Sequence, residues 1–275
     1  MARNRRRSSS FAGGTSSGAG TLFYVMGAIV AVGLLGFGFY LMNTTKAEMS
    51  ADAETLCPIS GPVAETVVLF DVTDPLDRTQ SEQLLQYLER EFAESAVGTQ
   101  FTMGIVSEDS GKWGATQALC KPRSGQEVSA LTQNVDMVKK RYEERFLAPI
   151  HDNLAKMMMA SGSNTSPIME ALQALVADTP GFLTFKGPRK VIMVSDLLQH
   201  SDAMSFYKGD DWQSFAVSPS YSSLGRTLDG VAIQIYQMPR VVDRIEDPAV
   251  IEDFWIRYFD QQGADLPRVS KLGGL

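Results

Sequence analysis

Two aspartates follow directly on short apolar runs of the sequence. Asp71 ends the run "ETVVLFD" at 65–71, and Asp196 ends the run "RKVIMVSD" at 189–196. Both runs are rich in valine and other large apolar residues, as in strands that are buried on both faces of a parallel sheet. Ligands of such sheets bind beyond the carboxyl ends of the strands, where the strand order reverses. If the two strands are neighbours, we expect the two carboxylates to converge on one small volume.

Two hydroxyl side chains complete a candidate oxygen site. Thr73 comes two residues after Asp71 in "DVTDP", and Ser166 lies in "NTSPIMEAL". Carboxylate and hydroxyl oxygens are hard ligands that suit Mg²⁺, Mn²⁺ or Ca²⁺. The alternative is structural, because strand-end aspartates often accept hydrogen bonds from loop N–H groups without binding a metal. The residues alone leave both roles open.

Strand and helix signals alternate over residues 64–266. Further strand-like runs lie at 99–109 and 230–238, and helical patterns lie at 79–95, 134–159 with an interruption near Pro149, 166–178 and 247–264. Thr79 with Glu82 has the capping-box spacing, and Ser166 is the expected cap of its helix. This alternation predicts an α/β domain with a doubly wound, mostly parallel sheet that carries helices on both faces.

At these residues the chain resembles the von Willebrand factor type A (vWA) domain family, over residues 64–266. The metal-ion-dependent adhesion site of that family combines an Asp-x-Ser-x-Ser loop, a threonine in a "GGTPL"-like loop and an aspartate in a "TDG"-like turn. Asp71 and Thr73 match the first loop, Ser166 matches the second and Asp196 matches the third. The resemblance implies a Rossmann-like vWA fold with Asp71, Thr73, Ser166 and Asp196 around a metal.

The site departs from the family pattern at several positions. Pro75 stands where the second hydroxyl of the first loop belongs, and Asp74 is a candidate replacement ligand. Thr165 substitutes for Ser166 if the register shifts by one residue, and no glycine follows Asp196. The resemblance implies a protein-interaction module, not an enzyme. It would receive a carboxylate of a partner protein, either through a divalent ion (Mg²⁺, or Mn²⁺ or Ca²⁺) or in a pocket without metal.

A hydrolase is the alternative function. The stretch "LFDVTDP" partly resembles the phosphatase loop of the haloacid dehalogenase-like family, in which the first aspartate is the nucleophile. Asp71 would then attack a phosphate ester, but Thr73 stands where that loop has its second aspartate. The sequence contains no Gly-rich phosphate loop and no Cys/His metal cluster that would indicate another enzyme.

The N-terminal region predicts a membrane anchor. No charged residue occurs between Arg7 and Lys46, and the 22 residues at 21–42 read "TLFYVMGAIVAVGLLGFGFYLM". As a helix this stretch is roughly 33 Å long, enough to cross a hydrocarbon core of about 30 Å. A cleaved signal peptide is the competing interpretation, with "ADA" at 51–53 as the cleavage site. Its apolar core is usually only about 7 to 15 residues long, so we predict an uncleaved transmembrane helix through the lipid bilayer.

Charge sets the expected topology. An arginine cluster (Arg3, Arg5, Arg6 and Arg7) precedes the span, so the N-terminus is expected in the cytoplasm of a single-pass inner-membrane protein, with the C-terminal domain periplasmic or extracellular. The net charge of -7 and the pI near 5.0 give no general attraction to nucleic acid. The remaining expected segments are a disordered cytoplasmic tail at 1–20, a linker at 43–63 and a C-terminal tail at 267–275.

Small residues and cysteines suggest two further contacts. Gly27 and Ala31 form a small-xxx-small pair in the span, which makes a homodimer through this face a candidate. Cys57 and Cys120 both lie on the exported side, where a disulfide would close a loop of 64 residues. Two separate buried thiols are the alternative.

The connection at 197–229 is long and rich in aromatic residues. It is a candidate partner-binding surface, or else these rings cover a small core of the insertion itself. The aromatic residues in question are Phe206, Tyr207, Trp212, Phe215 and Tyr221.

Overall fold

The computed structural model of the protein consists of two compact units, residues 1–49 and 50–275. It describes residues 18–49, 51–71, 73, 75–115, 117–128, 134–158, 163–225, 227–240, 242, 245 and 247–273, without the side chains of 18–23, 41–49, 117, 153 and 156–158. Most of the tail expected at 1–20, and the candidate ligand Asp74, lie outside these residues.

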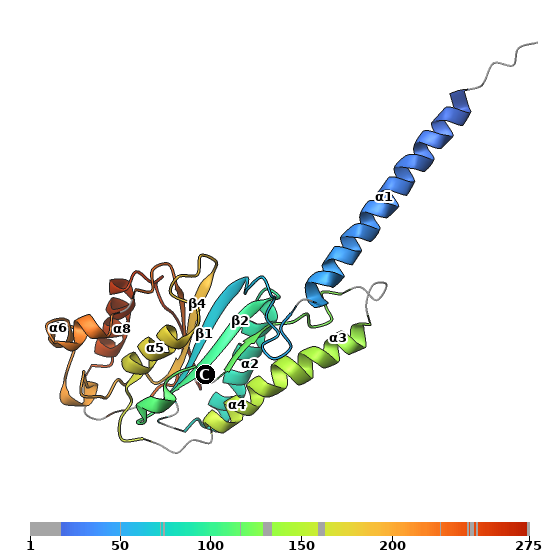
Figure 1. Ribbon diagram of the computed structural model, residues 1–275. Coiled ribbons are helices and arrows are strands. Elements are labelled where there is room, and N and C mark those ends of the chain that lie inside the picture. Colours follow the sequence, from blue (N-terminus) through green and yellow to red (C-terminus); the bar gives the residue numbers. More distant parts are fainter. Residues whose placement is uncertain are drawn as a thin grey trace, which may run out of the picture. The chain divides into compact units, whose positions relative to one another are not determined.

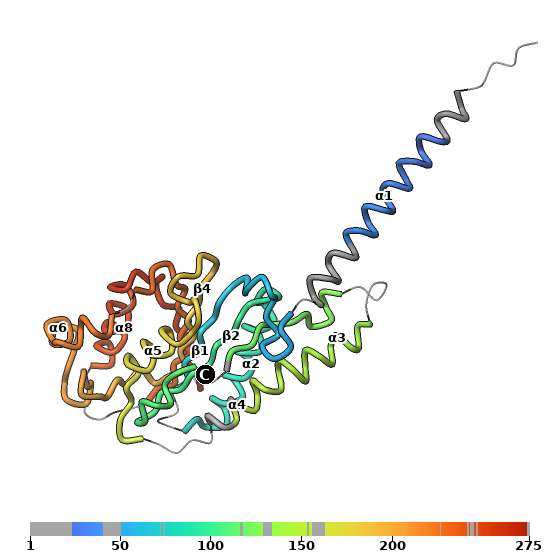
Figure 2. Tube along the Cα trace, in the orientation of Figure 1, coloured from blue at the N-terminus to red at the C-terminus, as the bar shows by residue number. Residues whose placement is uncertain are grey.

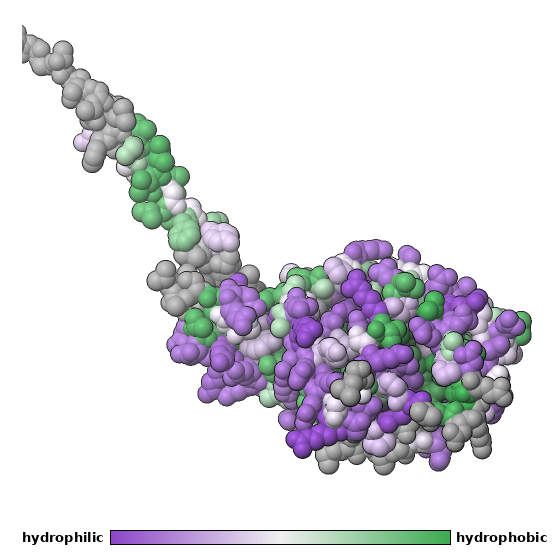
Figure 3. All heavy atoms as spheres, turned by 180° about the vertical axis from the view of Figure 1, so that it is seen from behind, coloured by the Kyte–Doolittle hydropathy of each residue, from purple (hydrophilic) through white to green (hydrophobic). Residues whose placement is uncertain are grey.

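The first unit contains one helix, α1 (Gly18–Met49). Its described side chains, at residues 24–40, are mostly apolar and exposed, with Tyr24 and Leu35 among them (Figure 3). Within the described parts of the chain, no helix has both the length and the apolar character that a membrane crossing requires. The transmembrane helix at 21–42 therefore stays a prediction.

The second unit is built on a six-stranded sheet with the order β3-β2-β1-β4-β5-β6 (Figure 1). Every neighbouring pair is parallel except β2 and β3. The strands are β1 (Ala64–Asp71), β2 (Thr99–Val106), β3 (Gln117–Cys120), β4 (Arg189–Ser195), β5 (Ala232–Gln237) and β6 (Arg268–Lys271). The two apolar runs are thus the neighbours β1 and β4, at the point where the strand order reverses. The predicted doubly wound, mostly parallel sheet is confirmed.

Helices cover both faces of this sheet (Figure 1). One face carries α2 (Arg78–Glu94), α3 (Val135–Tyr142), the π-helix η2 (Glu143–Leu147) and α4 (Ala148–Met158). The other carries α5 (Ile168–Asp178), α6 (Trp212–Ala216), α7 (Ser220–Ser223) and α8 (Ala249–Gln261). Short 3-10 turns occur at η1 (Ser110–Lys112) and η3 (Phe206–Lys208). Because β1 is buried on both sides, Val67 faces the α5 and α8 core while Val68 faces the α2 core.

Local chemistry determines where the helices begin and bend. Asp77 caps α2, since its Oδ1 accepts from Gln80 N (2.8 Å) and Gln80 Oε1 accepts from Asp77 N (3.1 Å). The predicted box of Thr79 with Glu82 is wrong because the helix is capped two residues earlier, by Asp77. The predicted interruption near Pro149 is the π-helix η2, within a continuous helical trace from α3 to α4 (Figure 2). Proline has no N–H for an intrahelical hydrogen bond, so the turn before it is rearranged.

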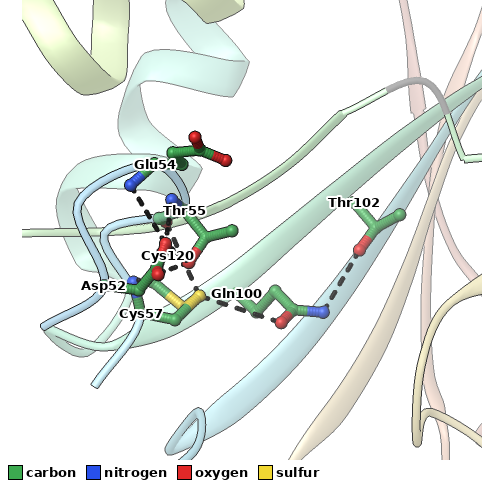
Figure 4. Close-up of a disulfide and its surroundings, with 7 residues drawn as sticks. All are labelled: Asp52, Glu54, Thr55, Cys57, Gln100, Thr102 and Cys120. Carbon is green, nitrogen blue, oxygen red and sulfur yellow. Dashed lines mark hydrogen bonds between the residues drawn. A yellow bond between two sulfur atoms is a disulfide. The ribbon is translucent and has the colours of Figure 1, made fainter. Parts of the chain in front are cut away.

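Both expected flanking segments of the domain differ from the prediction. The predicted linker at 43–63 is divided between the two units, because α1 continues to Met49 and residues 51–63 belong to the second unit. Cys57 and Cys120 form the predicted disulfide (Figure 4), and Cys120 N donates to Thr55 O (2.8 Å), which covers the edge of β3. The tail at 267–275 contains β6, a short polar edge strand whose exposed side chains carry no alternating apolar signal.

Candidate functional site

The four predicted site residues meet at the carboxyl edge of β1 and β4. Asp71 is the last residue of β1, Thr73 follows it, Ser166 precedes α5, and Asp196 follows β4. Their exposed fractions are 5%, 5%, 7% and 4%, respectively. Parallel pairing places the two strand ends side by side, so residues more than 90 positions apart in sequence, such as Asp71 and Ser166, come into contact.

The carboxylate of Asp71 is the centre of the site. Its Oδ1 accepts from Thr73 N (3.1 Å) and Thr73 Oγ1 (2.5 Å). Its Oδ2 accepts from Ser166 Oγ (3.1 Å) and Ser195 Oγ (2.9 Å). Burial raises the pKa of Asp71, and the hydrogen bonds from Thr73, Ser195 and Ser166 oppose that rise. Asp71 therefore orients three hydroxyl groups around a buried carboxyl group.

Ser195 is a member of this cluster that the sequence analysis missed. It is 1% exposed, is the last residue of β4, and also accepts from Leu197 N (2.8 Å). Its signals in the sequence are a hydroxyl at the end of an apolar run, next to Asp196, and the threonine that the "TDG"-like turn of the family has at this place.

The turn after β4 has an unusual backbone. Leu197 has φ 68°, a left-handed conformation that a leucine rarely adopts. The conformation is held by Ser195 from one side and by Trp255 of α8, whose Nε1 donates to Leu197 O (2.9 Å), from the other. Asp196 lies between Ser195 and Leu197 in the turn, and its Oδ1 accepts from Leu198 N (2.8 Å). The turn that presents Asp196 is therefore fixed by the helix behind it.

The loop of Ser166 is tied to the segment that follows this turn. Ser166 N donates to His200 O and His200 N donates to Ser166 O, both at 2.9 Å. The ring of His200 is held in turn, because its Nδ1 lies 2.8 Å from Ser205 Oγ. These contacts fix the loop before α5 against the loop after β4, independently of Asp71.

A depression with a volume of about 480 Å³ opens at the site. Thr73, Ser166 and Asp196 line it, together with the alternative ligand Thr165 and, from the insertion, Lys208. The structure thus brings Thr73, Ser166 and Asp196 to one accessible surface. Asp71 is buried against two of them.

The donor set fits a divalent cation by type. A hydroxyl that donates its hydrogen to Asp71 keeps its lone pairs, so Thr73 and Ser166 retain oxygen ligands while the carboxylate of Asp196 adds charge. Mg²⁺ usually keeps several waters and needs few protein ligands. Pro75 is exposed and adds no side-chain oxygen. Among the described residues no group of three or more His, Cys, Asp or Glu side chains is gathered for a metal, so the site would depend on its hydroxyls.

The aromatic residues of the insertion do not form one surface. Phe206 and Phe215 are 4% and 2% exposed and belong to the main core of the domain against α8, rather than to a separate core of the insertion. Tyr207 is half-buried beside the depression of the site. Trp212 and Tyr221 are half-buried around a second pocket.

No protein-family model and no curated protein matches the chain. Among solved structures, an aerotolerance-related membrane protein from Bacteroides fragilis NCTC 9343, with multiple mutations to serines, is 12% identical, covering 75% of this chain and 92% of that one, with a TM-score of 0.34. BatB from Bacteroides thetaiotaomicron is 12% identical (75% and 91% covered, TM-score 0.32). The SpRpn10 VWA domain is 9% identical (76% and 87% covered, TM-score 0.34). Similarity at this level carries no argument about the function of this chain.

Proposed function

We propose that the protein is a membrane-anchored, exported, vWA-like interaction module that receives a carboxylate of a partner protein at the carboxyl edge of β1 and β4. The convergence of Thr73, Ser166 and Asp196 on one depression, with Asp71 orienting the hydroxyls, supports this function. The residues come from three separate loops, and the strand order places them at the edge where such sheets bind ligands.

A divalent ion, Mg²⁺ or else Mn²⁺ or Ca²⁺, is the proposed link to the partner. Thr73, Ser166 and Asp196 would hold it, and Asp71 would orient Thr73 and Ser166. The ion would supply positive charge that an approaching carboxylate requires, since Asp71 and Asp196 alone repel it. The alternative ligand Thr165 lines the same depression and would serve if Ser166 does not bind.

The hydrolase alternative fits the geometry less well. A nucleophilic carboxylate must have an oxygen free to attack its substrate. Both carboxylate oxygens of Asp71 accept two hydrogen bonds each, and the residue is 5% exposed. An Asp71 in this setting is suited to orienting neighbours and poorly suited to attacking phosphorus.

The membrane anchor rests on the uncharged 22-residue stretch at 21–42 and on the helical conformation of α1 over it. The arginines before this stretch favour a cytoplasmic N-terminus in the inner membrane. Protease added to the outside of intact inner-membrane vesicles of right-side-out orientation should digest the domain and spare an N-terminal tag. Protection of the domain in that assay would overturn the proposed topology.

Asp196→Asn is the sharpest test of the binding site. Asp196 is buried, so alanine would disturb the turn, whereas the asparagine oxygen can still accept from Leu198 N while the charge is removed. Asp202→Asn, an exposed aspartate of the same loop, is the matched control.

The readout is cross-linking of the full chain to its partner in native membranes. We expect a loss of capture of about tenfold for Asp196→Asn, no change for Asp202→Asn, and loss in EDTA that Mg²⁺ or Mn²⁺ reverses in the wild type. Equal capture by all three proteins would exclude this site as the point of recognition. Capture that is insensitive to EDTA but lost in Asp196→Asn would retain the site and exclude the metal.

A further inference from the structure

A second pocket lies between α6, α7 and α8, outside the site at the strand ends. Its volume is about 140 Å³, and four aromatic residues line it: Trp212, Phe215, Tyr221 and Tyr258. A cavity of about 150 Å³ accommodates a group the size of benzene, so this one suits a single side chain.

The four rings form a floor and two walls. Phe215 and Tyr258 are each 2% exposed and make the floor, whereas Trp212 and Tyr221 are half-buried. The Tyr221 ring stands at 74° to Trp212 with centroids 6.0 Å apart, and at 68° to Phe215 with centroids 5.8 Å apart. The rings therefore pack edge to face against one another and give the pocket an aromatic lining, with which a cation can interact.

The surroundings of Trp212 are acidic. Asp211, Asp247 and Asp253 line a neighbouring depression that shares Trp212 with the aromatic pocket, together with Arg257. Arg257 is already paired with Asp253, at 2.8 and 2.9 Å, so these four described residues carry three negative charges and one positive charge. Asp211 directly precedes Trp212 in the sequence. The hydrogen bond from Ser214 N holds the pKa of Asp211 below its usual value, so its carboxylate is charged at neutral pH.

We propose that this aromatic pocket binds the side chain of an arginine from a basic segment of a partner protein. The planar guanidinium stacks on aromatic rings, and the acidic residues of the neighbouring depression favour a cation over a neutral group of the same shape. A proline or an aliphatic side chain would also contact the rings, but it would gain nothing from Asp211, Asp247 and Asp253. The pocket is separate from the proposed carboxylate site, so the protein would recognise both an acidic and a basic group.

The test uses the full chain in detergent, with N-acetyl-L-arginine amide as the probe and N-acetyl-L-citrulline amide as its neutral counterpart. Binding is followed by saturation-transfer NMR. We expect a dissociation constant in the millimolar range for the arginine probe, at least about fivefold tighter than for citrulline. Equal binding of the two probes, or no binding of either at tens of millimolar, would overturn the proposal.

Two variants connect this binding to the pocket. Trp212→Leu, which keeps an apolar side chain, should weaken arginine binding at least about fivefold, whereas Trp113→Leu, a half-buried tryptophan of the turn after β2, should not. Asp211→Asn keeps the cap of α6 and should weaken binding and its salt dependence. Should Trp212→Leu unfold, Asp211→Asn still decides the question, since unchanged binding in that variant contradicts a contribution of the neighbouring acidic residues.

Failure of this proposal is distinguishable from failure of the proposed function. EDTA and Asp196→Asn should leave arginine binding unchanged, because neither alters the aromatic pocket. If either abolishes it, the probe binds at the strand ends and the aromatic pocket is not a cation site.

Discussion

Removing the disulfide between Cys57 and Cys120 should lower the stability of the domain by about 4 kcal/mol. The two cysteines are 63 positions apart. In the loop-entropy treatment, closing a loop of this length raises the free energy of the unfolded chain by about 4 kcal/mol. The other contacts of residues 51–63 cannot compensate, because many of them are local. Asp52 Oδ1, for example, accepts from Thr55 N (2.7 Å) and Thr55 Oγ1 (2.8 Å) within one turn.

The assay is thermal unfolding of the full chain in detergent, oxidised and fully reduced, followed by circular dichroism. For a domain of this size, 1 kcal/mol corresponds to about 2–4 °C, so reduction should lower Tm by roughly 8–16 °C. The double variant Cys57→Ser, Cys120→Ser should unfold at the temperature of the reduced protein, and its Tm should not change when the reductant is added. Hydrogen exchange at Cys120 N, which donates to Thr55 O, should accelerate as the segment 51–63 loosens.

A shift below about 3 °C, with both thiols verified by alkylation, would refute this reasoning. It would mean that the unfolded chain is already restricted without the bond, or that the loop-entropy treatment does not apply to this domain. A large decrease in Tm with unchanged hydrogen exchange at Cys120 N would instead show that the disulfide stabilises the whole domain but is not needed to hold the segment 51–63 against β3.

Three further predictions concern the fold. Glu65 is 3% exposed, its Oε2 has no hydrogen-bond partner among the described residues, and burial raises its pKa, so the wild type loses stability as the pH rises through that pKa. In urea unfolding, Glu65→Gln should therefore be more stable than the wild type by about 1 kcal/mol at pH 7 and lose this advantage toward pH 4, whereas a difference that does not change with pH would contradict the prediction. Asp77→Ala should lower the free energy of unfolding by about 1 kcal/mol while Asp77→Asn changes it little, and equal losses would show that the cap is not responsible. A Cβ on Gly104 would lie 2.7 Å from Leu175 Cδ1, so Gly104→Ala should cost about 1–3 kcal/mol, unless an unchanged Tm shows that α5 can shift.

The sequence was sufficient for the parts of the site that follow from strand ends. An apolar run that stops at a carboxylate indicates both a buried strand and the edge at which it ends, so the sequence is enough to pair Asp71 with Asp196. Thr73 and Ser166 followed from a motif order that the topology preserves. The disulfide followed from two cysteines in the part of the chain that the sequence predicts to be exported.

The remainder depended on tertiary contacts that leave no periodic signal. The left-handed Leu197 is held in part by Trp255, 58 positions away, and no glycine at this position indicates such a conformation in the sequence. Lys121 is another example: it is 2% exposed, and its Nζ donates to Ala93 O (2.8 Å) and Ser95 O (2.7 Å) at the end of α2. A buried lysine is rare, and from the sequence this one would be assigned to the surface.

One helix, α8, packs against the supports of both proposed binding sites. Phe254 of α8 is fully buried, and its ring contacts Phe206 (5.3 Å), Trp212 (5.9 Å) and Phe215 (5.4 Å), while its neighbour Trp255 holds the turn that presents Asp196. The same few side chains of α8 therefore fix the rim of the polar depression and the floor of the aromatic pocket. Because close-packed aromatic contacts tolerate little displacement, an arginine that enters the aromatic pocket without moving these rings leaves the support of Asp196 in place. The helix α8 therefore keeps both sites in fixed positions, and recognition of a basic group and of an acidic group is expected to be independent.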